Sequence, residues 1–211
     1  MGYTEDQWSL RGMSRMDYGS QVTHLTRSAT IGGQEYEALD VLIKILRDRK
    51  IVGSTTSSGF IIGEQPAVCF QDAPPYSICE NIHFEWNLQQ KKGSEKMRYE
   101  ACGLMFQKPY LFGKGGRPVI YEQKEVAKTL LPRDQWWRIV NYDLSNPEYF
   151  IDWTHEREWR VAGNLDFDIK EVTVVVMNAD EFKSFHSKSA QNGEDVARLV
   201  NCVLPLGAIF I

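Results

Sequence analysis

The 211-residue sequence lacks long apolar runs and has no excess of positive charge. Its longest apolar stretches, such as 172–177 and 206–211, fall well short of the roughly 20 residues that a membrane-spanning helix needs. Lys and Arg number 24 against 28 Asp and Glu, which gives a net charge of -4. This balance excludes attraction of the whole molecule to nucleic acid or anionic lipid, so any basic site has to be local. We therefore expect no contact with a membrane.

Cysteine is also scarce, and Cys69, Cys79, Cys102 and Cys202 lie far apart with no CxxC pair. This spacing fits neither a disulfide framework nor a zinc finger. Because free cysteine behaves as a small apolar residue, we expect buried thiols. The sequence begins MGYTEDQW, without the basic region and apolar core of a secretory signal, so we expect a cytoplasmic location.

The residues that are present suit a packed core, since 43% are hydrophobic and 12% aromatic. Alternating or continuous apolar residues bounded by turn residues predict strands at 21–26, 66–70, 99–106, 118–121, 156–161, 171–177 and 204–211. Apolar residues at helical spacing predict helices at 35–49, 72–88, 109–112, 124–131, 179–185 and 194–200. We find no internal repeat. The pattern predicts one α/β domain of the α+β kind over residues 16–211, preceded by a tail over residues 1–15.

The segment 152–161, with the sequence DWTHEREWRV, is the most polar stretch between apolar strands. In a strand, the period of two places Glu156, Glu158 and Arg160 on one face, where a Glu-x-Glu pair can line a cleft. The alternative is a solvated edge strand whose charges form weak cross-strand pairs.

A metal site is a competing interpretation of the same segment. Asp152, His155, Glu156 and Glu158 carry donor atoms suited to a divalent ion, as in a metal-dependent nuclease. Their spacing matches no metal-binding motif, so we expect no bound metal.

Two further segments have possible chemical roles. His24 stands on the first expected strand, where a lone histidine is more often structural than catalytic. The loop Gly113 to Arg117 is rich in glycine but lacks the spacing of a phosphate-binding loop, so it is interpreted as a turn.

The order of several short motifs carries a resemblance to known proteins. These motifs are His24-Leu25-Thr26, the leucines of 42–46, Val68 to Pro74, Gly103 to Lys108, Gly115 to Tyr121 and Glu156 to Arg160. From Met16 to Val161 the chain is similar to the abortive-infection AbiGi-type phage-resistance proteins. It also resembles the wider DarT-like ADP-ribosyltransferase group, which shares the early His-x-Thr strand, the leucine-rich helix and the late strand glutamate.

The resemblance implies a compact ADP-ribosyltransferase-like domain in which two small β-sheets with flanking helices form a cleft for NAD. His24 matches the histidine that hydrogen-bonds the NAD ribose, with Thr26 beside it. Arg27 is a candidate for the pyrophosphate, since arginine suits phosphate geometry, or else a surface residue. Tyr99 and Phe106 are candidates for stacking on nicotinamide, or else core residues.

Glu158 matches the glutamate that contacts the nicotinamide ribose and promotes the departure of nicotinamide. Cleavage of that glycosidic bond generates an oxocarbenium-like sugar, which a fixed carboxylate stabilises. Glu156 stands where arginine-modifying members carry a second glutamate, which engages the acceptor or acts as a base.

The resemblance further implies a toxin or phage-defence effector with an antitoxin protein as partner. The expected target is a nucleic acid, RNA or single-stranded DNA, ahead of a protein. Local basic residues that suit such a target are Lys91, Lys92, Lys96 and Arg98 in one connection, Lys108, Lys114 and Arg117 in another, and Arg133 and Arg138 beside Trp136 and Trp137, since aromatic side chains stack on single-stranded bases. The alternatives are a non-enzymatic AbiGi-like regulatory or antitoxin protein and the metal-dependent nuclease described above.

Overall fold

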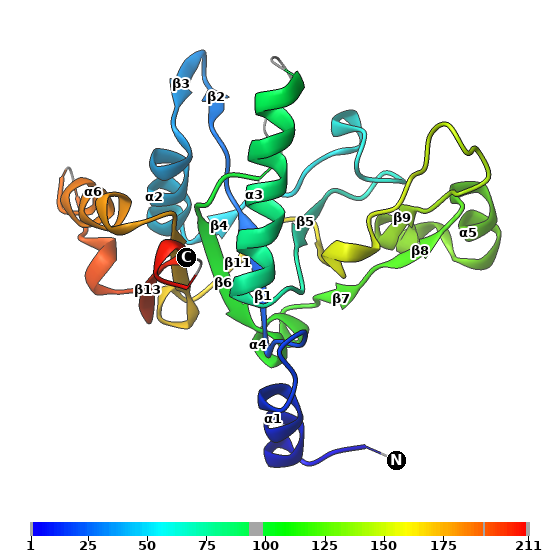
Figure 1. Ribbon diagram of the computed structural model, residues 1–211, viewed down its shortest axis with the longest axis horizontal. Coiled ribbons are helices and arrows are strands. Elements are labelled where there is room, and N and C mark those ends of the chain that lie inside the picture. Colours follow the sequence, from blue (N-terminus) through cyan, green and yellow to red (C-terminus); the bar gives the residue numbers. More distant parts are fainter. Residues whose placement is uncertain (1, 93–98, 192, 210–211) are drawn as a thin grey trace. The chain divides into compact units, whose positions relative to one another are not determined.

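The computed structural model describes residues 2–92, 99–191 and 193–209. The chain forms two compact units: unit 1 contains Met1–Arg49, Ala73–Gln107 and Phe167–Ile211, and unit 2 contains Lys50–Asp72 and Lys108–Asp166. Each unit mixes helices with short strands (Figure 1), which confirms the expected α+β class. Because the chain enters and leaves unit 2 twice, no single change of composition along the sequence marks the division.

The main sheet of unit 1 has four strands in the order β1, β6, β12, β13. They span Gln21–Leu25, Gly103–Gln107, Thr173–Val176 and Cys202–Pro205. Strand β6 is antiparallel to both of its neighbours, β1 and β12, whereas β12 and β13 are parallel. Strands β1 and β6 approach so closely that a Cβ atom on Gly103 would lie 2.3 Å from a main-chain oxygen of β1. This position therefore requires glycine.

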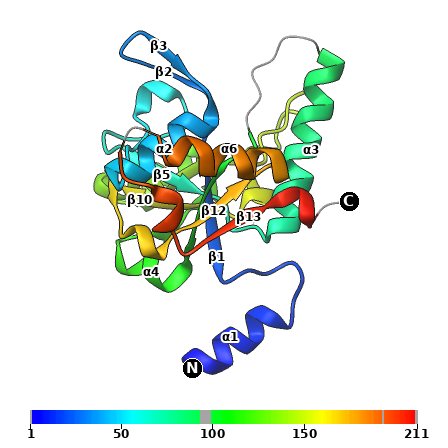
Figure 2. The ribbon, with the colours of Figure 1, turned by 90° about the vertical axis from the view of Figure 1, so that its left-hand side faces the viewer.

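The helices of unit 1 are α1 (Glu5–Met13), α2 (Ala38–Asp48), α3 (Pro75–Lys92) and α6 (Ala179–Ser189). Helices α2 and α6 lie side by side (Figure 2). A hairpin of β2 (Ala29–Ile31) and β3 (Gln34–Tyr36) precedes α2, so this helix begins later than its apolar pattern predicts. No helix among residues 2–92, 99–191 and 193–209 is both long and apolar enough to cross a membrane.

Helix α1 occupies most of the segment expected to be a tail. The Thr4 side chain accepts a hydrogen bond from the Gln7 main-chain N–H, and the Gln7 side chain accepts one from the Thr4 N–H. This reciprocal capping box begins the helix. Its Thr-x-x-Gln signal is visible in the sequence. The segment was predicted to be a tail because few apolar residues follow this signal.

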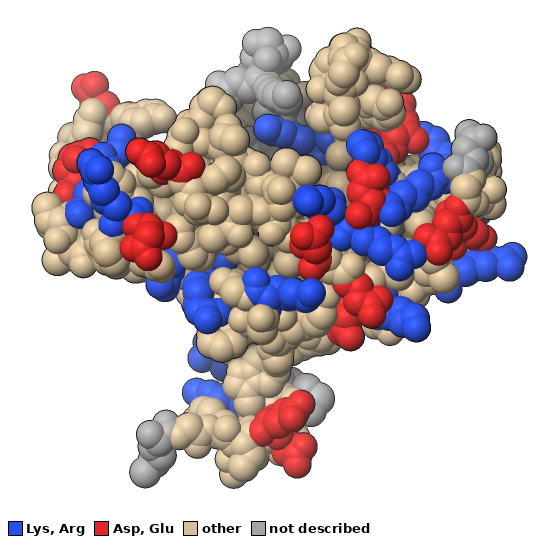
Figure 3. Space-filling view, turned by 180° about the vertical axis from the view of Figure 1, so that it is seen from behind, with Lys and Arg blue, Asp and Glu red and all other residues tan. Residues whose placement is uncertain are grey.

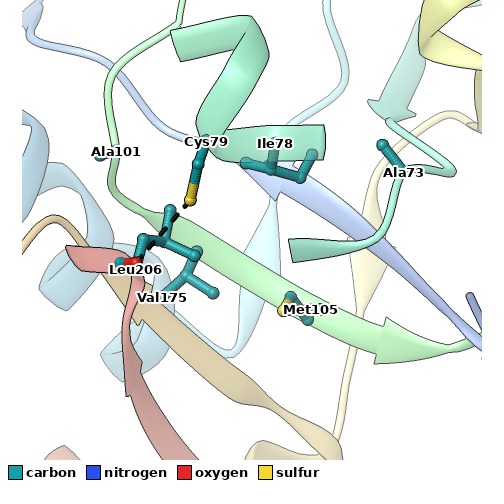
Figure 4. Close-up of a cluster of buried hydrophobic side chains, with 7 residues drawn as sticks. All are labelled: Ala73, Ile78, Cys79, Ala101, Met105, Val175 and Leu206. Carbon is teal, nitrogen blue, oxygen red and sulfur yellow. Dashed lines mark hydrogen bonds between the residues drawn. The ribbon is translucent and has the colours of Figure 1, made fainter. Parts of the chain in front are cut away.

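One apolar cluster joins the start of α3 to the main sheet of unit 1 (Figure 4). Its members come from the segment before α3, the start of α3, the segment before β6, two central strands and the turn after β13: Ala73, Ile78, Cys79, Ala101, Met105, Val175 and Leu206. The Cys79 thiol donates to the main-chain oxygen of Leu206 at 3.8 Å. The expected last strand, 204–211, ends at Pro205, and Leu206 turns into this cluster.

Unit 2 is built from shorter strands. One sheet contains β5 (Ala67–Phe70), β10 (Trp159–Ala162) and β7 (Arg117–Pro118), in that order. Two further sheets have two strands each: β8 (Ile120–Glu122) pairs with β9 (Ile139–Asn141), and β4 (Lys50–Ile51) pairs with β11 (Leu165–Asp166). Its α-helices are α4 (Lys108–Gly113) and α5 (Lys124–Leu130), both expected from the sequence. The 3-10 helices are Thr56–Ser58, Arg133–Arg138 and Thr154–Glu156 in unit 2, and Ile169–Glu171, Val196–Arg198 and Leu206–Ala208 in unit 1.

Candidate functional site

The candidate glutamates lie in unit 2, just before strand β10. Glu156 ends a 3-10 turn, Arg157 has the left-handed backbone angle φ of 45°, and the strand begins at Trp159. The expectation of a continuous strand from residue 156 is therefore wrong. The positive φ turns the backbone between the two glutamates, so they do not share a strand face by alternation. Glu158 directly precedes the strand that contains Arg160.

Glu158 forms a buried, two-point ion pair with Arg160. Arg160 Nε lies 2.7 Å from Glu158 Oε1, and Nη2 lies 3.1 Å from Oε2. The same guanidinium donates to the main-chain oxygens of Trp137, Ile139 and Phe60 at 2.8, 3.2 and 3.3 Å. Only 6% of Glu158 and 3% of Arg160 is exposed. Hydrogen bonds thus compensate for burying both charges and hold the carboxylate in one orientation.

The groups around this pair are kept in defined charge states. Burial has the largest single effect and lowers the pKa of Arg160, but the surrounding negative groups, with Glu158 foremost, together outweigh burial and raise this pKa. Burial, followed by the negative charge of Glu158, raises the pKa of the Cys69 thiol well above its usual value. Burial likewise raises the pKa of Tyr121, whose hydroxyl accepts the Glu158 main-chain N–H at 2.7 Å. Cys69 is therefore a neutral thiol and not a thiolate nucleophile at neutral pH.

A second buried ion pair, between Lys108 and Asp72, holds the backbone before Glu158. Lys108 Nζ lies 2.8 Å from Asp72 Oδ1. The main chain of Asp72 donates to the Glu156 oxygen at 3.0 Å and accepts from Arg157 Nε at 2.8 Å. Lys108 is 5% exposed, so its inclusion in an exposed basic cluster is wrong. We refer to Asp72, Lys108, Glu158 and Arg160 as the charged interior of unit 2.

Sequence reasoning did not assign Asp72, Lys108 or Tyr121 to the glutamate site. Asp72 and Lys108 each come soon after a buried strand, β5 and β6 respectively. A charged residue at the end of an apolar strand is a signal for a buried polar site, but the sequence does not reveal which of these residues become neighbours.

The residues expected to bind NAD belong to unit 1, and two of them are core residues. Thr26 is 3% exposed, and its hydroxyl lies 3.0 Å from the Cys102 oxygen and 3.3 Å from that of Ala38. Phe106 is fully buried and packs edge-on against Phe167, with ring centroids 5.4 Å apart. Neither arrangement fits a ligand contact.

His24, Arg27 and Tyr99 retain accessible surface. His24 lies on β1 and is half-buried, Arg27 follows the strand and is exposed, and Tyr99 is half-buried. Their role in binding NAD stays a prediction, and Glu156 and Glu158 belong to the other unit.

The residues of the metal alternative do not converge. Within the part of the chain that the structure describes, no three His, Cys, Asp or Glu side chains could hold a metal ion together. Asp152 instead accepts hydrogen bonds from the Thr154 hydroxyl and N–H at 2.6 and 2.9 Å, and these lower its pKa. It therefore orders the 3-10 turn before Glu158.

The cysteines are all free thiols, but one differs from expectation. Cys79 and Cys102 are buried and Cys69 is nearly so, whereas Cys202 is exposed. Cys202 begins β13, a strand at the edge of the main sheet, and the expectation of a buried thiol is wrong there.

Comparisons with protein-family models, with curated proteins and with solved structures found no match to this chain.

Proposed function

We propose that this chain is an NAD-dependent ADP-ribosyltransferase that acts as a toxin or phage-defence effector. Its catalytic glutamate is Glu158, and its target is a nucleic acid, RNA or single-stranded DNA, ahead of a protein. The observation that carries the proposal is the Glu158 carboxylate, which Arg160 holds at both oxygens.

The chemistry of the transfer requires a fixed anion. NAD supplies the ADP-ribosyl group and a neutral nicotinamide leaving group: the ribosyl C1′–nitrogen bond breaks, and the acceptor bonds to C1′ and loses a proton. Positive charge develops on the ribose as nicotinamide departs, and a preorganised carboxylate in a site with little water stabilises it.

Arg160 suits the role of a positioning residue for Glu158. Its guanidinium stays charged at any physiological pH, so it favours the ionised carboxylate. A carboxylate offers about four lone-pair positions; Arg160 takes one on each oxygen, and the Cys69 thiol is a further hydrogen-bond partner. Glu158 can therefore accept a further hydrogen bond from a ribose hydroxyl.

Glu156 is the proposed acceptor of the proton that the target loses. It is half-buried, and its main chain is bound to Asp72, whose side chain pairs with Lys108. The charged interior therefore positions both glutamates. The family resemblance assigns NAD-ribose binding to His24, which is tested separately below.

One observation favours a second candidate, a non-enzymatic regulatory or antitoxin protein. Glu158 is only 6% exposed, and a closed ion pair of this kind also serves to orient strands without any chemistry. In that case the charged interior is structural, and Glu158 does not meet a ligand.

The test is a transfer assay with NAD labelled in its ADP-ribose part, incubated with total RNA, single-stranded DNA or cell lysate. The Glu158→Gln variant is expected to transfer ADP-ribose about 100-fold more slowly, or slower still. In the Glu156→Gln variant, the rate of transfer to the acceptor is expected to fall more than the rate of nicotinamide release. His24→Ala is expected to raise the NAD concentration needed for half-maximal rate. The matched control is Glu148→Gln, a change in an exposed turn of unit 2.

Circular dichroism and thermal unfolding of each variant separate lost chemistry from lost structure. Expression of the parental chain is expected to slow host growth, and Glu158→Gln to relieve it. Absence of both label transfer and nicotinamide release in every fraction contradicts the proposal and favours the binding protein. Full activity in a folded Glu158→Gln variant removes Glu158 from the catalytic role.

A further inference from the structure

Two arginine side chains of unit 2, Arg117 and Arg138, meet at the short strand β7 (Arg117–Pro118). Arg138 donates from Nε and Nη2 to the main-chain oxygen of Pro118, at 3.2 and 3.1 Å, so it reaches the residue next to Arg117. Among the residues that the structure describes, neither guanidinium forms an ion pair with a carboxylate. This contrasts with Arg160 and Lys108 in the same unit, which both do.

The two guanidinium groups also influence each other electrostatically. Burial lowers the pKa of Arg138, and the positive charge of Arg117 lowers it further. Placing like charges together costs free energy, and a bound anion would offset that cost. The chain has a net charge of -4, and the face shown in Figure 3 mixes basic and acidic side chains, so such a site depends on local geometry and not on overall charge.

Both groups are held in place by main-chain oxygens. Arg117 Nη1 donates to the oxygens of Phe112 and Gly116, at 3.0 and 2.6 Å, and both arginines are half-buried. Each guanidinium keeps N–H groups beyond those that bind these oxygens, and its planar fork matches two phosphate oxygens. Less side-chain entropy is therefore lost on binding than with a free surface arginine.

An exposed aromatic ring completes the cluster. The Arg117 guanidinium carbon lies 3.8 Å from the centroid of the Phe112 ring, and 53% of Phe112 is exposed. The ring therefore stacks on the Arg117 guanidinium and keeps about half of its surface exposed. A flexible strand of nucleic acid presents the complementary pair, a phosphate next to an unstacked base.

We propose that Arg117, Arg138 and Phe112 form a binding surface for single-stranded nucleic acid, with the arginines on a backbone phosphate and Phe112 against a base. This inference takes from the proposed function only the class of target, a nucleic acid. Binding of the strand itself requires no NAD. It also refines the basic clusters expected from the sequence. Lys108 is buried in its ion pair, Trp137 is 5% exposed, and the side chains of Lys91, Lys92, Lys96 and Arg98 lie outside those described.

The test measures fluorescence anisotropy of labelled 12-nucleotide DNA and RNA strands of mixed sequence, without NAD, over a series of salt concentrations. The double variant Arg117→Gln/Arg138→Gln is expected to bind at least about tenfold more weakly at low salt. Its slope of log affinity against log salt is expected to shrink by about 0.7 for each phosphate contact that is lost. The matched control, Arg11→Gln/Arg198→Gln, removes the same charge from exposed positions of unit 1 and is expected to bind like the parent.

Phe112→Leu separates stacking from charge. It is expected to weaken binding about tenfold while the salt slope stays unchanged. Arg117→Lys/Arg138→Lys keeps both charges but not the planar forks, and is expected to keep the slope with weaker binding. Thermal unfolding verifies that each variant is folded. If the glutamine variant is unstable, the lysine variant still measures the contribution of the planar guanidinium groups to binding.

Two results would overturn the inference. They are parental affinity in the folded Arg117→Gln/Arg138→Gln variant and equal weakening by the matched control. The two proposals fail separately, because Glu158→Gln is expected to slow transfer about 100-fold or more without weakening strand binding, and the arginine variants are expected to weaken strand binding in the absence of NAD.

Discussion

The two units of this protein differ in what their interiors contain. Unit 1 buries mainly apolar side chains, including Leu42, Phe106 and Phe185. Unit 2 buries two ion pairs, Glu158–Arg160 and Asp72–Lys108. Among the described residues, the remaining ion pairs have at least one substantially exposed partner. Both units have an apolar core, but among the described residues only the interior of unit 2 also contains ion pairs, whose burial has a cost in free energy.

The cost follows from the desolvation of ions. Moving a charged side chain out of water costs several kcal/mol, and replacement of a buried pair by apolar residues is often neutral or stabilising. A charged interior is therefore a poor way to stabilise a small sheet but a good way to orient a carboxylate. The following predictions test this difference between the units, from the largest expected effect to the smallest.

The largest effect is expected from breaking one buried pair in unit 2. Glu158→Leu leaves Arg160 buried without its counter-charge and should lower the free energy of unfolding by about 3–5 kcal/mol. The double change Glu158→Leu/Arg160→Met removes both charges and should recover most of this loss. Urea unfolding at pH 7 measures both, and a single variant within about 1 kcal/mol of the parent would contradict the prediction.

A smaller loss is expected from the apolar interior of unit 1. Leu42 is fully buried on α2, so Leu42→Ala should lower the free energy of unfolding by about 3 kcal/mol through lost contacts and a cavity. Leu130→Ala, at a side chain that is 70% exposed, should change it by less than about 0.5 kcal/mol. Equal losses in the two variants, again by urea unfolding, would show that Leu42 does not belong to a tight core.

The smallest effect is a pH dependence in unit 1. Burial raises the pKa of Cys102 to about 12, above the value of about 8.5 for a thiol in an unfolded chain. The folded state keeps this proton when the unfolded state loses it, so the contribution to stability is complete below pH about 8.5 and falls as the pH rises towards about 12.

Cys102→Ala removes this contribution. The difference in unfolding free energy between parent and variant should therefore shrink by about 2 kcal/mol from pH 8 to pH 10. Urea unfolding at several pH values provides the measurement. A difference that does not change with pH would mean that the Cys102 thiol is not protected in the folded state.

The periodicity of the sequence predicted those helices and strands in which apolar side chains are buried at regular intervals. The strands β1, β5 and β12 and the helices α2, α4 and α5 lie where the pattern places them, with ends shifted by a few residues. The prediction failed at the residues before β10, where the left-handed Arg157 interrupts an extended pattern. Alternation of side chains cannot reveal a single backbone turn of this kind.

The sequence by itself determined that the protein is a mixture of helices and short strands with a core of aromatic and aliphatic residues, because the spacing of apolar residues follows the local geometry of each element. The tertiary structure alone decided that Asp72 meets Lys108, that Arg138 reaches Pro118 beside Arg117, and that Thr26 and Phe106 turn into the core. The physical reason is that these contacts join residues from separate elements, and pairing of elements depends on the packing of each unit as a whole.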